Sequence, residues 1–380
     1  MLRSRAVNSV VLLFICLCLA GCPGSGPVTR YSVTDLGSFG GDRSNALGVN
    51  DQGQVVGLSE MPSDIAQGFV WDEATGIHSI GSLNEHSEAW DINEAGQIVG
   101  ETNTLGNTIH PFLWMPDEPN GTTGTLHDMG APASDWAGAW QINESGQVTG
   151  WSALPGPDEW RPFVWTPDDP NGTAGTYVHL GTLGGVGAET YAINDLGQTA
   201  GYSVMPDSDF YHAILWTPET PNGDTGTMYD LGTLGGSESE ARGINASGVV
   251  VGEAALEGDE EKHAFRWVPT TPNGSSGEMQ DLGTLGGDAS IAYSITDAGE
   301  IVGRSTTRTG ENAAFLWTEV CGMIDLNKRL NAACRYNPHT GKGWKITIAR
   351  DINAQGWIVG SGTLDGGDLR AVLLRPITED

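Results

Sequence analysis

One stretch decides the fold: Ala139-Trp140-Gln141-Ile142-Asn143-Glu144-Ser145-Gly146-Gln147-Val148-Thr149-Gly150. It has the form Ala-x-x-Ile-Asn-x-x-Gly-x-x-x-Gly, and variants of it recur along the chain. The other copies lie at 46–57, 89–100, 190–201, 241–252, 292–303 and 349–360. Successive copies are spaced by 43, 50, 51, 51, 51 and 57 residues, with Thr296 replacing the Asn of the sixth copy. This regularity predicts a repeat protein.

Each repeat can be translated into short strands. Trp140 and Ile142 alternate with Ala139 and Gln141, and this period of two predicts a strand. Asn-x-x-Gly predicts a tight hairpin, because Asn suits the first position of a type I turn and Gly adopts left-handed backbone. A second β-rich stretch follows. Third and fourth strands are expected at motifs such as 163–165 (Phe-Val-Trp) and 230–232 (Asp-Leu-Gly). Four short antiparallel strands in about 50 residues are typical of a propeller blade.

Four repeats also carry Pro-Asn-Gly between the third and fourth strands, at 119–121, 170–172, 221–223 and 272–274. This is turn chemistry, and it predicts hairpin tips.

The two ends of the chain complement one another. The last repeat stops after Ala371–Leu374 without an Asp-Leu-Gly strand, whereas Tyr31–Gly37 supplies one before the first repeat. Because a ring of sheets must cover its last edge, we expect the N-terminal strand to complete the last blade. The prediction is all-β: a seven-bladed β-propeller of four-stranded antiparallel blades over 31–376, followed by a tail at 377–380.

The first residues resemble an export signal. Arg3 and Arg5 precede an apolar run from Val10 to Leu19, which is shorter than a membrane-spanning helix requires. The run ends in Leu-Ala-Gly-Cys at 19–22, which resembles the lipobox of bacterial lipoproteins and implies cleavage before a diacylglycerol-modified Cys22. The expected organisation is a signal peptide at 1–21 and a lipidated linker at 22–30. An ordinary signal peptide with a chance cysteine is the alternative.

Composition narrows the partners. The 380 residues carry 48 acidic and 18 basic side chains, a formal net charge of −30, which argues against nucleic acid as a partner. A lipid anchor would attach the protein to the membrane of the cell envelope, and the outer membrane is the expected location. The propeller itself is expected to be monomeric. After loss of the signal peptide and acylation of Cys22, Cys321 and Cys334 form an even pair in an oxidising compartment, so a disulfide is expected.

Several motifs together resemble the HAF-family extracellular repeats of bacteria. They are Asp-Leu-Gly-Thr-Leu-Gly-Gly at 230–236 and 281–287, His-Ala-Phe-x-Trp at 263–267, and the Ile-Asn-x-x-Gly-x-x-x-Gly core of the repeat. The resemblance covers nearly all of 31–375. It implies a surface or secreted repeat protein with a propeller fold, and it brings no established activity and no catalytic residues.

Function should lie where the repeats differ. The third repeat brings Trp136, Trp151 and Trp160 together with the carboxylates of Asp135, Asp158 and Glu159. Exposed aromatic rings beside carboxylates could stack against a sugar and bind its hydroxyl groups. The alternative is that these tryptophans pack between blades.

Acidic residues also gather in two loops. Asp207 and Asp209 precede the run of Glu257, Asp259, Glu260 and Glu261 by one repeat. Clustered carboxylates could hold Ca²⁺, the one cofactor that the sequence suggests, whereas a solvated acidic loop is the simpler interpretation.

No catalytic motif is found. The leading hypothesis is therefore a non-catalytic binding scaffold on the cell envelope that recognises a glycan or a protein. A polysaccharide-acting enzyme with paired carboxylates is the first alternative, and a Ca²⁺-dependent adhesion protein is the second.

Overall fold

The computed structural model describes residues 29–155 and 159–377. The described chain is all-β, as predicted: it holds 28 strands and one short 3-10 helix, with no α-helix among these residues. Within the same ranges, no helix is long and apolar enough to span a bilayer. The predicted signal peptide, Cys22 and residues 378–380 lie outside the described residues.

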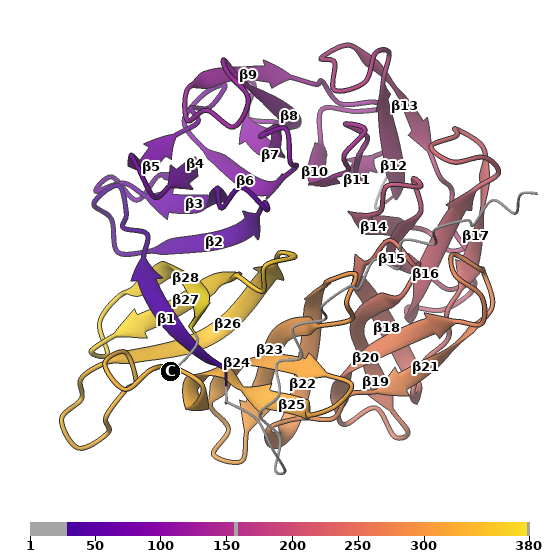
Figure 1. Ribbon diagram of the computed structural model, residues 1–380. Coiled ribbons are helices and arrows are strands. Elements are labelled where there is room, and N and C mark those ends of the chain that lie inside the picture. Colours follow the sequence, from indigo (N-terminus) through magenta and orange to yellow (C-terminus); the bar gives the residue numbers. More distant parts are fainter. Residues whose placement is uncertain (1–28, 156–158, 378–380) are drawn as a thin grey trace, which may run out of the picture.

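The strands form consecutive antiparallel sheets of four, which follow one another around a ring (Figure 1). The first sheet contains β2 (Ser44–Val49), β3 (Val55–Glu60), β4 (Ala66–Asp72) and β5 (Gly76–Ser79). The second contains β6 (Ser87–Ile92), β7 (Ile98–Asn103), β8 (Ile109–Pro116) and β9 (Gly124–Asp128). The third contains β10 (Ala137–Ile142), β11 (Val148–Ala153), β12 (Trp160–Pro167) and β13 (Gly175–His179). The fourth contains β14 (Ala188–Ile193), β15 (Thr199–Val204), β16 (Tyr211–Pro218) and β17 (Gly226–Asp230).

Two further sets of four are joined into one eight-stranded sheet by a single parallel bridge between Lys262 and Ala289. One set contains β18 (Gly235–Ile244), β19 (Val250–Leu256), β20 (Lys262–Pro269) and β21 (Gly277–Asp281). The other contains β22 (Gly286–Ile295), β23 (Ile301–Thr307), β24 (Asn312–Thr318) and β25 (Gly322–Asp325), followed by the 3-10 helix η1 (Leu326–Lys328).

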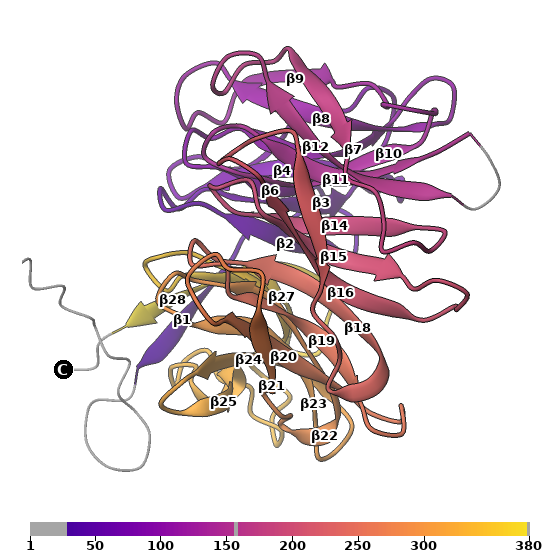
Figure 2. The same cartoon turned by 90° about the vertical axis from the view of Figure 1, so that its right-hand side faces the viewer.

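The last sheet joins the two ends of the described chain. It contains β26 (Trp344–Ile352), β27 (Ile358–Leu364) and β28 (Leu369–Ile377), with β1 (Arg30–Asp35) as its fourth strand. β1 pairs antiparallel with β28, from Arg30 opposite Ile377 to Asp35 opposite Val372, as the sequence predicts. The two strands lie side by side in both views (Figures 1 and 2). The segment between η1 and β26 covers the other edge of β1, because Tyr31 and Asn331 donate backbone hydrogen bonds to Arg329 and Tyr31.

The core lies between neighbouring sheets. Phe163 and Trp165 of β12 are buried together with Ala139 and Ile142 of β10 and Val99 of the preceding sheet. Burial of such side chains is the main stabilising contribution in the fold, at roughly 1.5–3 kcal/mol for each large apolar residue. The third-strand motif Phe-x-Trp therefore belongs to the core.

A β-bulge alters the predicted alternation in every first strand. In β10 the register shifts between Ala139 and Gln141, so Trp140 is the extra residue without its own partner. Ala139 and Ile142 consequently pack in the same cluster, although strict alternation predicts opposite faces. The prediction that Trp140 and Ile142 share a face was wrong for this reason.

The Asn-x-x-Gly and Pro-Asn-Gly predictions are confirmed. The backbone N–H of Gly146 donates to the carbonyl oxygen of Asn143, and Gly146 has a φ of 81°. The Pro-Asn-Gly tips lie between third and fourth strands, with Asn171 at a φ of 58°. These tips also join neighbouring sheets, because Gln97 Nε2 donates to the carbonyl oxygen of Asn171.

The expected Cys321–Cys334 disulfide is not formed. Cys334 is a free, half-buried cysteine that packs against the apolar cluster containing Tyr31, Leu330 and Trp344. Cys321 lies in the turn between β24 and β25, where its backbone N–H donates to Thr318. An even count of cysteines predicted a pair, but the segment that carries Cys334 folds onto β1 instead.

Candidate functional site

The bulged residues of the first strands converge on one cavity. β2, β6, β10, β14, β18, β22 and β26 contact one another in this order, and β26 returns to β2. Each carries its register shift at the same repeat position. The residues at that position are Leu47, Trp90, Trp140, Tyr191, Arg242, Tyr293 and Arg350, and all of them line a cavity of ≈ 450 Å³. This volume falls within the range of small-molecule sites.

One side of the cavity is aromatic. The rings of Trp90 and Trp140 meet edge to face at 4.6 Å between centroids, and Trp140 lies 5.6 Å from Tyr191. Tyr191 in turn stacks against Tyr202 of β15. The indole Nε1 atoms of both tryptophans are buried and have no hydrogen-bond partner within the described chain. The wall thus offers two unused N–H donors beside apolar ring surface.

The other side is cationic. The guanidinium of Arg242 lies 4.1 Å from the ring centroid of Tyr191, and that of Arg350 lies 4.3 Å from the ring centroid of Tyr293. Arg304 of β23 lines the same cavity. Burial lowers the pKa of Arg350, although nearby Tyr293 raises it, and the neighbouring charges of Arg242 and Arg304 lower it further.

Within the part of the chain that the structure describes, Arg242 is the one of these arginines that has an ion pair. Arg242 Nη2 lies 3.0 Å from Glu240 Oε1. Among the described residues, neither Arg304 nor Arg350 has a carboxylate within ion-pair distance, and Arg242 Nε has no hydrogen-bond partner. A partly buried cation such as Arg350 is normally paired, so an anion is the missing partner that this arrangement favours, with the exposed Arg304 beside it.

Two carboxylates lie at the inner end of the cavity. Asp91 and Asp351 line it, and Asp351 also lines a second cavity of ≈ 260 Å³ toward the Asn-x-x-Gly hairpins. Burial raises the pKa of both carboxyl groups, and their mutual repulsion adds to the shift of Asp91.

These carboxylates hold neighbouring sheets together. Asp91 Oδ2 accepts the backbone N–H of Ile142 in the next sheet at 3.0 Å. Asp351 Oδ2 accepts the N–H of Val49 at 2.9 Å, which links the last sheet to the first. Asp351 Oδ1 accepts the Ser294 hydroxyl as well. Their hydrogen bonds give both residues a structural role.

Three partly buried glutamates near the cavity have raised pKa values. Burial and the neighbouring Glu88 raise the pKa of Glu101 to about 7. Burial also raises the pKa of Glu189 and of Glu253. Glu189 contacts Tyr191 and Tyr202 on the aromatic side, whereas the charges of Arg242 and Arg304 lower the pKa of Glu253 and partly offset its burial.

The three predicted tryptophans lie on neighbouring segments of the third repeat, where Ala153 of β11 donates its backbone N–H to Trp136 and pairs with Trp160 of β12. Trp136 is 43% exposed and precedes β10. Trp151 lies opposite Gly138, near Glu101 of the preceding sheet. The ring of Trp160 covers Gly187 of the following sheet, so this residue packs between sheets, as the alternative predicted.

Two of the three carboxylates predicted to accompany these tryptophans lie within the described residues. Asp135 is exposed, Glu159 lies 3.6 Å from Arg161, and Asp158 lies outside the described residues.

The predicted Ca²⁺ ligands do not form a cluster. Asp207, Asp209, Glu257 and Glu260 are exposed. Asp259 accepts the backbone N–H of Ser237, and Glu261 lies 3.6 Å from His263. In residues 29–155 and 159–377, no three His, Cys, Asp or Glu side chains are grouped so that they could hold a metal ion.

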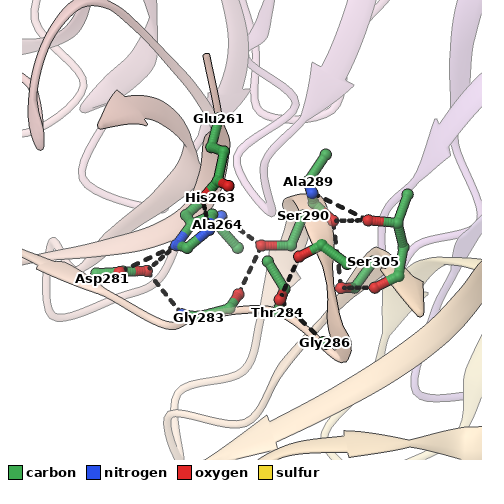
Figure 3. A network of polar contacts seen from close by, with 12 residues as sticks. Glu261, His263, Ala264, Asp281, Gly283, Thr284, Gly286, Ala289, Ser290 and Ser305 are labelled. Atoms are coloured by element: carbon green, nitrogen blue, oxygen red, sulfur yellow. Dashed lines mark hydrogen bonds and ion pairs between the residues drawn. The ribbon is translucent and has the colours of Figure 1, made fainter. Parts of the chain in front are cut away.

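The histidines of the His-Ala-Phe motif have structural partners. His263 Nδ1 lies 2.9 Å from Asp281, whose carboxylate also accepts the N–H of Gly283 (Figure 3). Ser290 connects the same corner to the next repeat, since its hydroxyl donates to Gly283 and accepts the N–H of Ala264. His110 and His212 make the same contact with Asp128 and Asp230. The His-Ala-Phe and Asp-Leu-Gly motifs are therefore two halves of one contact.

The cavity residues escaped the sequence analysis, although a signal was present. The position after the repeated Ala is occupied by Leu, Trp, Trp, Tyr, Arg, Tyr and Arg in successive repeats. Every repeat has a large side chain at this position and its identity varies, which is a sign of a ligand-facing position. The alternating pattern placed it on the same face as the Ile of the motif instead.

Comparison with known proteins bears on the fold alone. No protein-family model and no curated protein matches the chain. Among solved structures, a puromycin hydrolase mutant complexed with PGG is 15% identical, covers 90% of this chain and has a TM-score of 0.58. The chain spans 54% of that protein.

Two other solved structures are more distant. TolB from Acinetobacter baumannii is 11% identical over 85% of this chain and 82% of its own, with a TM-score of 0.42. A lectin from Burkholderia pseudomallei is 11% identical over 93% and 99%, with a TM-score of 0.37.

Proposed function

We propose that the chain is a seven-bladed β-propeller, closed by β1, that serves as a non-catalytic binding module and takes its ligand into the central cavity. We further propose that it belongs with the HAF-family repeat proteins and is held at the outer membrane by an acylated Cys22. Covered sheet edges support the closed ring, because β1 pairs with β28 and Asp351 and Asn353 bond to the first sheet.

The observation that carries the proposal is that the constant and the variable residues of the repeat have different positions. The constant residues Asn, Gly, Phe and Trp are buried and hold strands and sheets in place. The variable residue at each bulge faces the shared cavity. Aromatic rings with free N–H donors suit a saccharide, whose C–H face stacks on rings and whose hydroxyl groups accept hydrogen bonds.

An enzyme that hydrolyses polysaccharide is the second candidate, because Asp91 and Asp351 share a cavity with Trp90 and Trp140. A hydrolase needs one carboxylic acid to donate a proton and one carboxylate to act as nucleophile or base. Backbone N–H groups of other sheets already occupy these carboxylates, which favours binding over hydrolysis. Release of reducing ends from a glycan that binds would reverse this preference.

Glycan-array binding by the purified protein tests the proposal. A Trp90→Ala/Trp140→Ala double variant should lose the binding, whereas Trp136→Ala, which removes an exposed ring outside the cavity, should retain it. Loss in the Trp136 variant alone would move the site to the outer face of the third sheet. Absence of binding to any glycan would reject a saccharide ligand.

The anchor is tested separately. Cells that express the protein with labelled palmitate should incorporate the label, and Cys22→Ser should abolish incorporation. Label in the Cys22 variant would exclude this residue as the modified site.

A further inference from the structure

The distribution of positive charge points to the kind of ligand. The chain has only 18 Lys and Arg residues against 48 Asp and Glu. Yet Arg242, Arg304 and Arg350 line a single cavity, and they come from the fifth, sixth and seventh repeats. Positive side chains close together repel one another and lose hydration, so gathering them is unfavourable unless an anion neutralises them.

Two of the three arginines, Arg304 and Arg350, have no ion pair among the described residues, although Glu253 interacts electrostatically with Arg304 and Arg242. Glu240 pairs with Arg242, at 3.0 Å. Asp351 directs its carboxylate to Val49 and Ser294, and Asp91 directs its carboxylate to Ile142. Arg304 is exposed, and Arg350 contacts the ring of Tyr293 without an ion pair in the described chain.

The unused polar atoms in and around this site are donors. Arg242 Nε and the Nε1 atoms of Trp90 and Trp140 are buried without partners among the described residues. A buried donor without a partner costs about 1–3 kcal/mol, which a ligand acceptor would recover. The cavity therefore favours a ligand that is rich in acceptor oxygens and carries its negative charge next to the arginines.

We propose that the cavity binds an acidic saccharide, with a sugar ring against Trp90 and Trp140 and a carboxylate against Arg304 and Arg350. This inference rests on the proposed function and names its substrate class. The planar guanidinium matches a carboxylate through two parallel hydrogen bonds, which gives a preference over neutral sugars of the same shape. The aromatic wall distinguishes such a ligand from a free small anion, which would use the arginines alone.

Isothermal titration of the purified full chain tests the inference. The probes are tetramers of galacturonate, mannuronate and hyaluronan, each compared with its methyl ester, in which the charge is removed and the sugar is kept. At least one acid should bind about 10-fold or more tightly than its ester, since a charge-assisted pair contributes on this scale. The advantage should shrink as salt is raised, because salt screens the pairing.

Variants locate the site. Arg350→Gln and Arg304→Gln should each weaken binding of the acid about 10-fold and leave the ester unchanged, and Arg350→Lys should recover part of the loss. Arg308→Gln is the matched control, because it removes the same charge from an exposed loop position outside the cavity. Melting temperatures of all variants show whether each remains folded.

The outcomes separate this inference from the function on which it rests. Equal binding of acid and ester, lost in the Trp90/Trp140 variant, would overturn the acidic preference and keep the saccharide site. Tighter binding of a sulfated neutral tetramer than of any carboxylated one would overturn the carboxylate assignment. No binding of any saccharide would overturn both.

Discussion

Asn353 in the last sheet donates a hydrogen bond from Nδ2 to the backbone carbonyl oxygen of Asn50 in the first sheet, at 3.0 Å. The same bond links each repeat to the next, from Asn50 to Asn93, Asn143, Asn194, Asn245 and Thr296 in turn. Each Asn also accepts the backbone N–H that closes its own hairpin, as Asn50 Oδ1 does from Gln54. The repeated Asn thus stabilises its own hairpin turn and also connects its repeat to the next one by a hydrogen bond.

One link in this circle is missing, and restoring it should stabilise the protein. Thr296 accepts the N–H of Glu300 with its hydroxyl but has no amide to donate toward Asn353. Thr296→Asn should supply that donor and add about 1 kcal/mol of stability, the usual net value of one hydrogen bond. The melting temperature, followed by circular dichroism, should rise by about 2 °C. Asn143→Thr removes a link and should lower it, and an unchanged or lower value for Thr296→Asn would mean that the circle is not a stabilising unit.

The last Gly of the repeat should not tolerate a side chain. A Cβ atom at Gly201 would collide with the backbone oxygen of Glu189 in the adjoining strand β14, which lies directly against it. Gly201→Ala should therefore cost about 3 kcal/mol or more, in the range of severe backbone clashes. Gly106→Ala is the control, because the nearest atom to its added Cβ lies 3.6 Å away. Urea unfolding of both variants would show the difference, and equal midpoints would contradict this account.

Local chemistry made much of the fold predictable. Asn143 and Gly146 close a hairpin through contacts within four residues, and Asp35-Leu36-Gly37 reproduces the geometry of the other fourth strands, since Asp35 Oδ1 accepts the N–H of Gly37. Such signals depend on residues close in sequence, so a single sequence contains them. Repetition then extended one local interpretation to the whole chain.

The candidate site was not predictable by the same means. A β-bulge changes which residues share a face. The bulged residue Trp140 gives no sequence signal for a bulge, whereas a glycine in left-handed backbone would. The sequence did not reveal that Trp160 is packed, because the ring lies over Gly187, which has no side chain to indicate a contact. The aromatic and arginine walls come from strands about 50 residues apart, so their proximity depends on how the sheets are arranged in space.

Stability should fall as pH rises through the range in which Glu101 titrates. Burial beside Glu88 raises the pKa of Glu101 from its ordinary 4.5 to about 7. Below pH 4.5 both folded and unfolded chains bind the proton, so the group has no effect; between 4.5 and 7 the unfolded chain releases it first, and above 7 the full penalty is present. Glu101→Gln should therefore stabilise the protein by up to about 3 kcal/mol at pH 8 and by little at pH 4.5.

Differential scanning calorimetry at the two pH values checks this prediction. Glu278→Gln is the matched control, because Glu278 is exposed on β21 and its replacement removes the same charge. An equal gain for both variants would attribute the effect to net charge instead of burial.

Asp91 offers a sharper test of the carboxylates in the cavity. Its Oδ2 accepts the N–H of Ile142, and at the same position of the next repeat Gln141 accepts the N–H of Ile193 with an amide oxygen, at 2.7 Å. An amide oxygen can therefore accept this hydrogen bond between repeats in place of a carboxylate. Burial, with Asp351 nearby, raises the pKa of Asp91, so its ionised form destabilises the fold above the ordinary carboxyl range. Asp91→Asn should raise the melting temperature at pH 8 and leave it nearly unchanged at pH 3.

Asp91→Ala should lower the melting temperature at both pH values, because it leaves the buried N–H of Ile142 without a partner, at a cost of about 1–3 kcal/mol. If Asp91→Asn also destabilised the protein at pH 8, the ionised carboxylate itself would be required, and the case for a catalytic pair with Asp351 would gain strength. If instead Asn stabilises and Ala destabilises, Asp91 holds two sheets together as the geometry indicates, and the aromatic rings and arginines remain the groups that meet a ligand.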